Sequence, residues 1–365
     1  MRMEKRNRIK EIFDLYTSDL SFEEIEKLIK HDSPEVFQYF AKDIGKQDQT
    51  GNKIVRFLLF LRNLFNAFLL KLTPARRIIY LASIIIIIVG FFYGLTSYII
   101  LSFLMINLLL AFELADKLTT KDELTLAKNI QENLIPQQPP VLAKFDISTY
   151  YISAKEISGD YFDFLRNNTD SENLYIVIGD ISGKGLASAL YMVRVQAILQ
   201  SLINYYDTLK DILGILNRYF SKNLSSGYFL TLLIAKLDES GTVTFSRAGH
   251  TPLLYYNCRN DEFKDYDPKG LGIGLNNGTI FETSLEEVTI KPETGDFLFF
   301  YTDGVTEAMN SQHEEFGIQR VKDLIRKNKT SPVKEIAKII EKNISTFRNI
   351  TPVNDDITFI LLKAK

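Results

Sequence analysis

Four aspartates lie where predicted strands begin or end beside turn residues, and their carboxylates could do chemistry. They are Asp160 in "SGDYFDF", Asp180 in "IGDISGKG", Asp303 in "YTDGVTE" and Asp355 in "NDDITFILL". A single Asp-Gly at a strand end is usually only a turn. Several carboxylates brought together would carry an uncompensated negative charge, which bound divalent cations relieve. Four such positions in one region therefore favour a metal site, although their spacing leaves open whether they meet in space.

The composition restricts the chemistry that is available. The chain has three histidines, His31, His250 and His313, and one cysteine, Cys258. A His-rich zinc site, an HExxH protease, an internal disulfide and an HCxxxxxR cysteine phosphatase are therefore excluded. A metal would need oxygen ligands, which favours magnesium, manganese or calcium. Lys+Arg is 43 and Asp+Glu is 45, so the balanced charge predicts no general attraction to nucleic acid.

The elements that must position these aspartates begin near residue 145. β-rich runs are predicted over 145–153, 174–181, 228–238, 242–249, 296–303 and 355–364. Stretches of helical period are predicted near 186–205, 209–224, 318–327 and 333–347. Strands and helices form neighbouring groups, which predicts an α+β layered domain rather than a doubly wound parallel sheet.

An uncharged run, residues 78–112, predicts a transmembrane segment. It is longer than the roughly 20 residues that cross a bilayer. Two helices joined by a turn near 94–97 are favoured over one, although helices of about 16 to 17 residues would be short. Arg76 and Arg77 precede the run and favour a cytoplasmic start. We therefore expect the protein to lie in the inner or cytoplasmic membrane, with its catalytic domain in the cytoplasm.

Three further regions surround the uncharged run. Residues 1–52 form a predicted helical N-terminal region, and residues 53–77 form a basic, Phe/Leu-rich amphipathic helix suited to a membrane surface. Residues 113–140 form a linker or regulatory helix that ends at prolines, with Ile130 or Gln131 on its apolar face. This helix can pair with a copy of itself in a homodimer or pack on the downstream domain, and both remain open.

Six motifs in order carry a family resemblance: "SGDYFDF", "IGDISGKGLASALYM", "RAGHTPLLYY", "LGIGL", "YTDGVTEAMN" and "NDDITFILL". They resemble the PPM-type, protein phosphatase 2C-like, metal-dependent serine/threonine phosphatases, most closely the bacterial SpoIIE-like and RsbU-like branch. The resemblance covers about residues 124–365. It implies a four-layer α-β-β-α sandwich over residues 141–365 with two manganese or magnesium ions at one end.

The resemblance also implies which residues bind the metal ions, and these metal ligands form the catalytic site. These are the carboxylates of Asp160, Asp180, Asp303 and Asp355 and the backbone carbonyl of Ile181. Asp180 would bridge the two ions. Asp356 is the neighbour that could be mistaken for Asp355, and Asp163 is expected to support the ligands rather than bind metal.

Two residues around "RAGH" need separate treatment. Arg247 stands where asparagine is common in the branch, which puts the local hydrogen-bond role of that position in doubt. His250 could protonate the leaving oxygen, but a packed or turn-stabilising histidine beside Gly249 is favoured.

The predicted reaction is hydrolysis of a phosphate monoester by metal-activated water, without a covalent phosphoenzyme. The sequence therefore predicts a membrane-anchored phosphatase of phosphoserine or phosphothreonine on a regulatory protein. Similar proteins often act on STAS-domain antagonists of anti-sigma factors. The alternatives are a non-catalytic membrane-tethered signalling scaffold, which the complete set of four acids disfavours, and a phosphoesterase of small molecules, for which no base or sugar pocket is recognisable.

Overall fold

The computed structural model describes residues 62, 65–66, 68–154, 157–167, 173–183, 185–225, 227–276 and 278–365, without the side chains of 120–124. The chain divides into two compact units, residues 1–118 and 119–365. The predictions for residues 1–52, and most of that for 53–77, lie outside the described residues.

The first unit contains a helical hairpin. Helix α5 (Pro74–Phe92) and helix α6 (Thr96–Leu134) are joined by a turn in which Gly94 has a φ of +65°. The two helices are tied by a buried hydrogen bond of 2.6 Å from the Ser102 hydroxyl to the Ser83 carbonyl. The predicted turn near 94–97 and the hairpin are therefore confirmed.

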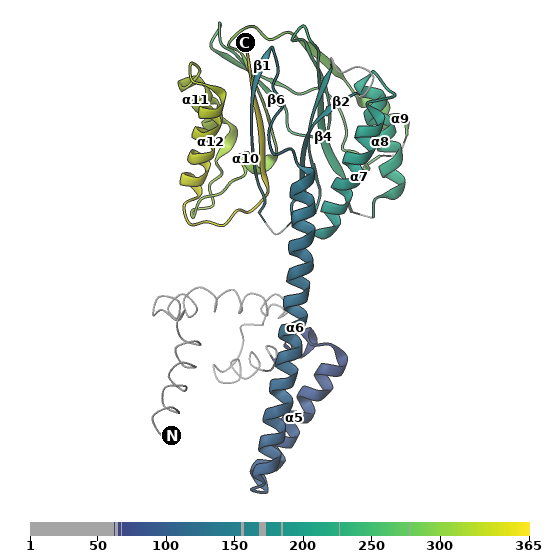
Figure 1. Cartoon of the computed structure of the whole chain (residues 1–365), viewed down its shortest axis with the longest axis vertical. Coiled ribbons are helices and arrows are strands. Elements are labelled where there is room, and N and C mark those ends of the chain that lie inside the picture. Colours follow the sequence, from purple (N-terminus) through teal and green to yellow (C-terminus); the bar gives the residue numbers. More distant parts are fainter. Residues whose placement is uncertain are drawn as a thin grey trace, which may run out of the picture. The chain divides into compact units, whose positions relative to one another are not determined.

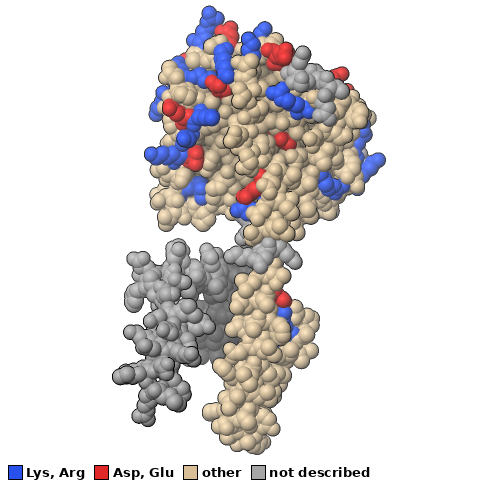
Figure 2. Space-filling view, in the orientation of Figure 1, with Lys and Arg blue, Asp and Glu red and all other residues tan. Residues whose placement is uncertain are grey.

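Both hairpin helices are longer than the sequence suggested. Pro74 begins α5 because its fixed φ suits the first turn of a helix, so this helix has 19 residues. The apolar part of α6 covers Thr96–Thr119, 24 residues, and continues without a break into the predicted linker helix. By length and composition both can cross a membrane. The face of this hairpin in Figure 2 carries very few charged side chains.

The second unit contains two five-stranded sheets in which all neighbouring strands are antiparallel. The first sheet has the order β1 (Phe145–Ile152), β10 (Ile357–Ala364), β9 (Phe297–Tyr301), β6 (Leu253–Asn257) and β7 (Glu262–Tyr266). The second sheet has the order β2 (Asp160–Arg166), β3 (Leu174–Ile181), β4 (Leu230–Leu237), β5 (Val243–Ala248) and β8 (Glu287–Ile290).

Helices cover the outer face of each sheet, as Figure 1 shows. Helices α7 (Leu186–Leu202) and α8 (Leu209–Asn223) pack on the second sheet, with the short α9 (Thr279–Ser284) beside α8. Helices α11 (Gly317–Lys327) and α12 (Val333–Arg348) pack on the first sheet, and the short α10 (Asp303–Thr306) follows β9. A third apolar cluster lies between the sheets. The predicted α+β, four-layer α-β-β-α sandwich is therefore confirmed.

Side chains alternate between the two faces of β2 and β3, and this alternation decides where each acid lies. Tyr161 and Val177 face the helices, whereas Phe162 and Ile178 face the other sheet. Asp160 has the same parity as Phe162 and therefore lies on the face between the sheets.

Candidate active site

Asp160 and Asp180 lie directly opposite each other on neighbouring strands. Asp160 begins β2 and is paired with Asp180 near the end of β3. The Asp160 side chain is only 2% exposed. Burial, and after it the negative charge of Asp180, raise the pKa of Asp160 well above its ordinary value. Two carboxylates so placed repel each other, and a cation between them would relieve the repulsion.

The Asp160 carboxylate also connects the two sheets. Its Oδ2 accepts a hydrogen bond of 2.8 Å from the Thr302 hydroxyl and another from the Thr358 hydroxyl. Thr302 follows β9 and immediately precedes Asp303, while Thr358 lies in β10, three residues after Asp355. The two hydroxyls therefore bring these strand ends next to Asp160.

Two glycines allow the backbones at this end to approach closely. A Cβ on Gly304 would lie 1.9 Å from the carbonyl oxygen of Asp356, so only glycine fits at this position beside the backbone of Asp356. A Cβ on Gly159 would lie 2.9 Å from the carbonyl oxygen of Ile181 and 3.0 Å from Oδ1 of Asp180. The segments that carry all five predicted ligands consequently meet at one end of the sandwich.

The carboxylates of the neighbouring acids Asp356 and Asp163 accept hydrogen bonds that stabilise the surrounding fold. The two carboxylate oxygens of Asp356 accept hydrogen bonds of 2.7 Å each from the backbone amides of Ala154 and Gly159. Asp356 thereby fastens the turn that precedes β2. Asp163 lies on the opposite face of β2 from Asp160 and accepts a hydrogen bond of 3.0 Å from the Gln196 side chain of α7. Support of the metal ligands by Asp163 stays a prediction, and the hydrogen bonds described for its carboxylate are with Tyr161, Phe164 and Gln196.

The donor set at this end fits a hard divalent cation. It consists of carboxylate and carbonyl oxygens, including a buried carboxylate that faces another. Within the described part of the chain, however, no three Asp, Glu, His or Cys side chains are grouped as a ready-made metal site. The acids are neighbours without yet converging on one point.

His250 is a packed residue. Its side chain is buried, and Nδ1 lies 3.0 Å from the hydroxyl of Thr231, the residue paired with Asp180. Burial lowers the pKa of His250 to about 3. The imidazole is therefore neutral near pH 7 and lacks the imidazolium proton that a general acid would give to a leaving oxygen, which supports the favoured interpretation.

Arg247 fixes a loop beside the site. Its guanidinium donates to the carbonyl oxygens of Pro268, at 3.1 Å, and His250, and it forms an ion pair with Asp267. A planar group with five donor hydrogens can donate to three acceptors at once, whereas an asparagine amide has only two donor hydrogens. Arg247 therefore has a defined hydrogen-bond role in holding this loop.

Gln131 is a residue that sequence reasoning missed. It lies on the buried face near the end of α6, and its amide binds both backbone groups of Ser158, at 2.8 Å to the carbonyl and 3.0 Å from the N–H. The Ser158 hydroxyl in turn accepts the N–H of Asp160 at 3.0 Å. Gln131 belongs to the second unit, so the end of α6 packs within that unit beside the start of β2. A glutamine at an apolar-face position was the available signal.

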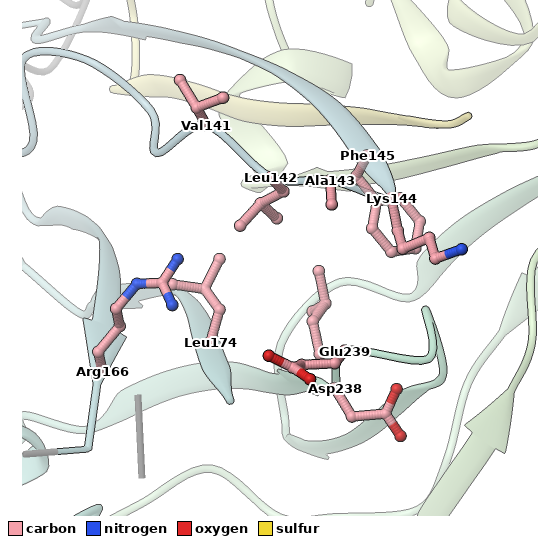
Figure 3. A pocket seen from close by; sticks show the side chains of 10 residues that line it. Val141, Leu142, Ala143, Lys144, Phe145, Arg166, Leu174, Asp238 and Glu239 are labelled. Atoms are coloured by element: carbon pink, nitrogen blue, oxygen red, sulfur yellow. The ribbon is translucent and has the colours of Figure 1, made fainter. Parts of the chain in front are cut away.

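A separate cavity lies at the other end of β2. It has a volume of about 380 Å³, and Arg166, Leu174 and Asp238 lie around it (Figure 3). Asp160 and Arg166 are the two ends of β2, so this cavity is remote from the acids.

The sequence and the fold are similar to those of known proteins. The model of the family Stage II sporulation protein E (SpoIIE) matches residues 170–365. Phosphoserine phosphatase RsbU of Bacillus subtilis is 29% identical over 248 residues, 67% of this chain and 71% of RsbU. Phosphoserine phosphatase RsbP of the same organism is 26% identical over 254 residues, 68% of this chain, and the match spans only 59% of RsbP.

The fold recurs in a solved structure. The SiaA-PP2C domain of Pseudomonas aeruginosa is 19% identical to this chain, with a TM-score of 0.58, and the match covers 68% of this chain and 98% of that domain. At this identity the likeness concerns the fold alone. The family match, in contrast, covers more than half of the residues. The chain therefore belongs to the SpoIIE family of PP2C-like protein serine/threonine phosphatases.

Proposed function

We propose that the protein is a membrane-anchored, metal-dependent phosphatase that hydrolyses phosphoserine or phosphothreonine on a regulatory protein. The observation that carries this proposal is the meeting of the Asp160, Asp180, Asp303 and Asp355 segments at one end of the sandwich. The phosphoserine phosphatases RsbU and RsbP support the reaction class.

The proposed ligands are the four carboxylates and the Ile181 carbonyl, with two manganese or magnesium ions. Such ions, when bound, supply a water of lowered pKa and offset charge on the phosphoryl oxygens. The chain itself supplies the alignment. Pairing with β4 fixes the backbone of Asp180, and the Thr302 and Thr358 hydroxyls fix the carboxylate of Asp160.

Membrane anchoring rests on the two apolar helices of the hairpin. Arg76, near the start of α5, forms ion pairs with Glu113, at 2.8 Å, and Asp116 of α6. These pairs bring the start of α5 beside the acidic residues that follow the uncharged run in α6, as a two-span hairpin requires. Together with Arg77 they support a cytoplasmic catalytic unit in the inner or cytoplasmic membrane. A STAS-domain antagonist of an anti-sigma factor as substrate, and a homodimer formed through α6, are parts of the same proposal.

The test is turnover of a phosphoserine peptide and of p-nitrophenyl phosphate by the full chain in phospholipid nanodiscs, with and without manganese. We expect manganese-dependent turnover that Asp180→Asn and Asp303→Asn both abolish. Asp146→Asn is the matched control, because Asp146 lies on β1 and pairs with Lys365 at 3.0 Å. A folded, manganese-binding protein without turnover would favour the scaffold alternative.

A further inference from the structure

Large apolar side chains are exposed on segments that border the end of β3, where Asp180 and Ile181 lie. Four leucines are 47%, 57%, 37% and 60% exposed, in chain order Leu186, Leu190, Leu271 and Leu275. The first two lie in the first turns of α7, and the others lie in the loop 267–276. The half-buried Tyr228 lies among the same segments. We call these four leucines and Tyr228 the apolar rim.

The apolar rim is continuous with the acid site through the backbone. Ser182 follows the proposed ligand Ile181, donates its N–H to the Phe229 carbonyl at 2.9 Å, and accepts the Phe229 N–H at 2.8 Å through its hydroxyl. The Tyr228 ring lies 3.1 Å from where a Cβ on Gly183 would lie, and 5.4 Å from the ring of Tyr191 on α7.

The loop that carries two of the rim leucines is held in place from inside the protein. The buried Asn217 of α8 donates to the carbonyl of Asn276 and accepts the N–H of Gly274, both at 2.9 Å. Ile273 and Leu230 exchange two backbone hydrogen bonds of 2.8 and 3.0 Å. The Arg247 contacts with Asp267 and the Pro268 carbonyl fasten the start of the same loop.

Exposed apolar side chains on a fixed backbone are suited to recognition, because little conformational entropy is lost when a partner covers them. A small phosphate ester would fill the acid site without reaching them. A phosphorylated protein segment would necessarily lie over the surface that borders the site.

We propose that the apolar rim binds the residues that flank the phosphoserine, and that these residues are apolar. This inference rests on the proposed function and adds the chemistry of the substrate segment. The partner is a phosphoprotein whose phosphoserine lies among leucine-like or aromatic side chains, rather than among acidic or small polar ones.

The experiment compares three substrates with the full chain in nanodiscs and manganese. Two phosphoserine peptides of equal length and charge carry either Leu and Phe or Ser and Gly beside the phosphoserine, and p-nitrophenyl phosphate reports the acid site alone. We expect kcat/KM for the apolar peptide to exceed that for the polar peptide at least tenfold. Leu190→Asp and Leu275→Asp should bring this ratio near one and leave p-nitrophenyl phosphate turnover within twofold.

The matched control is Val141→Asp. Val141 is 94% exposed and lies beside the cavity at the other end of the sandwich (Figure 3), so this variant should keep the preference. If an aspartate variant also loses p-nitrophenyl phosphate turnover, Leu190→Ala and Leu275→Ala are judged by the same ratio.

Three results would overturn the inference: equal kcat/KM for both peptides, a preference that survives in both rim variants, or rim variants that change only the oligomeric state. Failure to hydrolyse any of the three substrates would overturn the proposed function itself. Turnover of all three without a preference would overturn the apolar rim alone.

Discussion

Replacing Gln131 by alanine should reduce turnover although Gln131 is not a proposed ligand. The variant removes the amide that binds both the N–H and the carbonyl of Ser158, and Ser158 is fully buried. The Ser158 hydroxyl accepts the N–H of Asp160, so the loss acts directly on the start of β2. The helix that carries Gln131 is continuous with the second apolar helix.

The size of the effect follows from the groups left without partners. A buried polar group that loses its hydrogen bond costs about 1–3 kcal/mol. Loss of two such hydrogen bonds, partly relieved by local opening, should shift the equilibrium between ordered and open forms of the turn by about 2 kcal/mol, which is about 30-fold in the equilibrium constant. We therefore expect kcat/KM for p-nitrophenyl phosphate to fall by up to about 30-fold in Gln131→Ala.

The assay measures manganese-dependent turnover, the free energy of unfolding, and hydrogen exchange of the amides of residues 157–160. Gln137→Ala is the matched control, since Gln137 lies just past α6 and its exposed amide donates to the nearby carbonyls of Glu132, at 2.8 Å, and Ile135, at 3.4 Å. Turnover within twofold of the unmodified chain, with unchanged exchange at Ser158 and Asp160, would refute the reasoning. An equal loss of activity in Gln137→Ala would refute it as well.

Three further predictions concern the packed groups around the acids. Thr302→Val and Thr358→Val should each lower the free energy of unfolding by about 1–3 kcal/mol in denaturant titrations, and less than additively together because both hydroxyls serve one oxygen of Asp160. Asp160→Asn should raise the free energy of unfolding of the metal-free protein at pH 7.5 and abolish manganese-dependent turnover, because it removes a buried charge opposite Asp180; a less stable variant would contradict this. The pKa of His250, lowered from 6.5 to about 3, means that the unfolded chain takes up a proton below pH 6.5 while the folded chain does not. Acidification to pH 5.5 should therefore lower the free energy of unfolding by about 1.4 kcal/mol, and the His250→Gln variant should not show this loss. Equal pH profiles of the free energy of unfolding for the two proteins would contradict the prediction.

The long helices and most of the interior strands could be predicted closely from the sequence. Helices α8 and α11 match their predicted ranges within a residue at each end, because one apolar face repeats every three to four residues. The interior strand β6 was not among the predicted β-rich runs. The edge strands β7 and β8 were not predicted either. Their sequences, "EFKDY" and "EVTI", are short and mostly exposed, so no buried face produces a pattern.

The candidate site was predicted in its acids and not in the residues that hold them. Glycine turns beside apolar runs pointed to Asp160 and Asp180, but nothing along the chain indicated that these residues are paired across two strands. Gln131 shows the limit most clearly. Either it or Ile130 could have faced the core, and the buried residue is the polar one because Ser158 offers it two hydrogen bonds.

The arrangement of Asp160 explains why the acids can be placed together before any cation binds. Two sheets that pack through apolar side chains have no intrinsic register at their ends, because such contacts are not directional. One buried carboxylate on the second sheet, bound by the hydroxyls of Thr302 and Thr358 on the strands of the first, supplies that register. The same bonds hold the segments of Asp303 and Asp355 against that of Asp180. Burying the Asp160 carboxylate is unfavourable in free energy, and this burial is what aligns the two sheets at the site. A bound divalent cation would offset part of that unfavourable free energy.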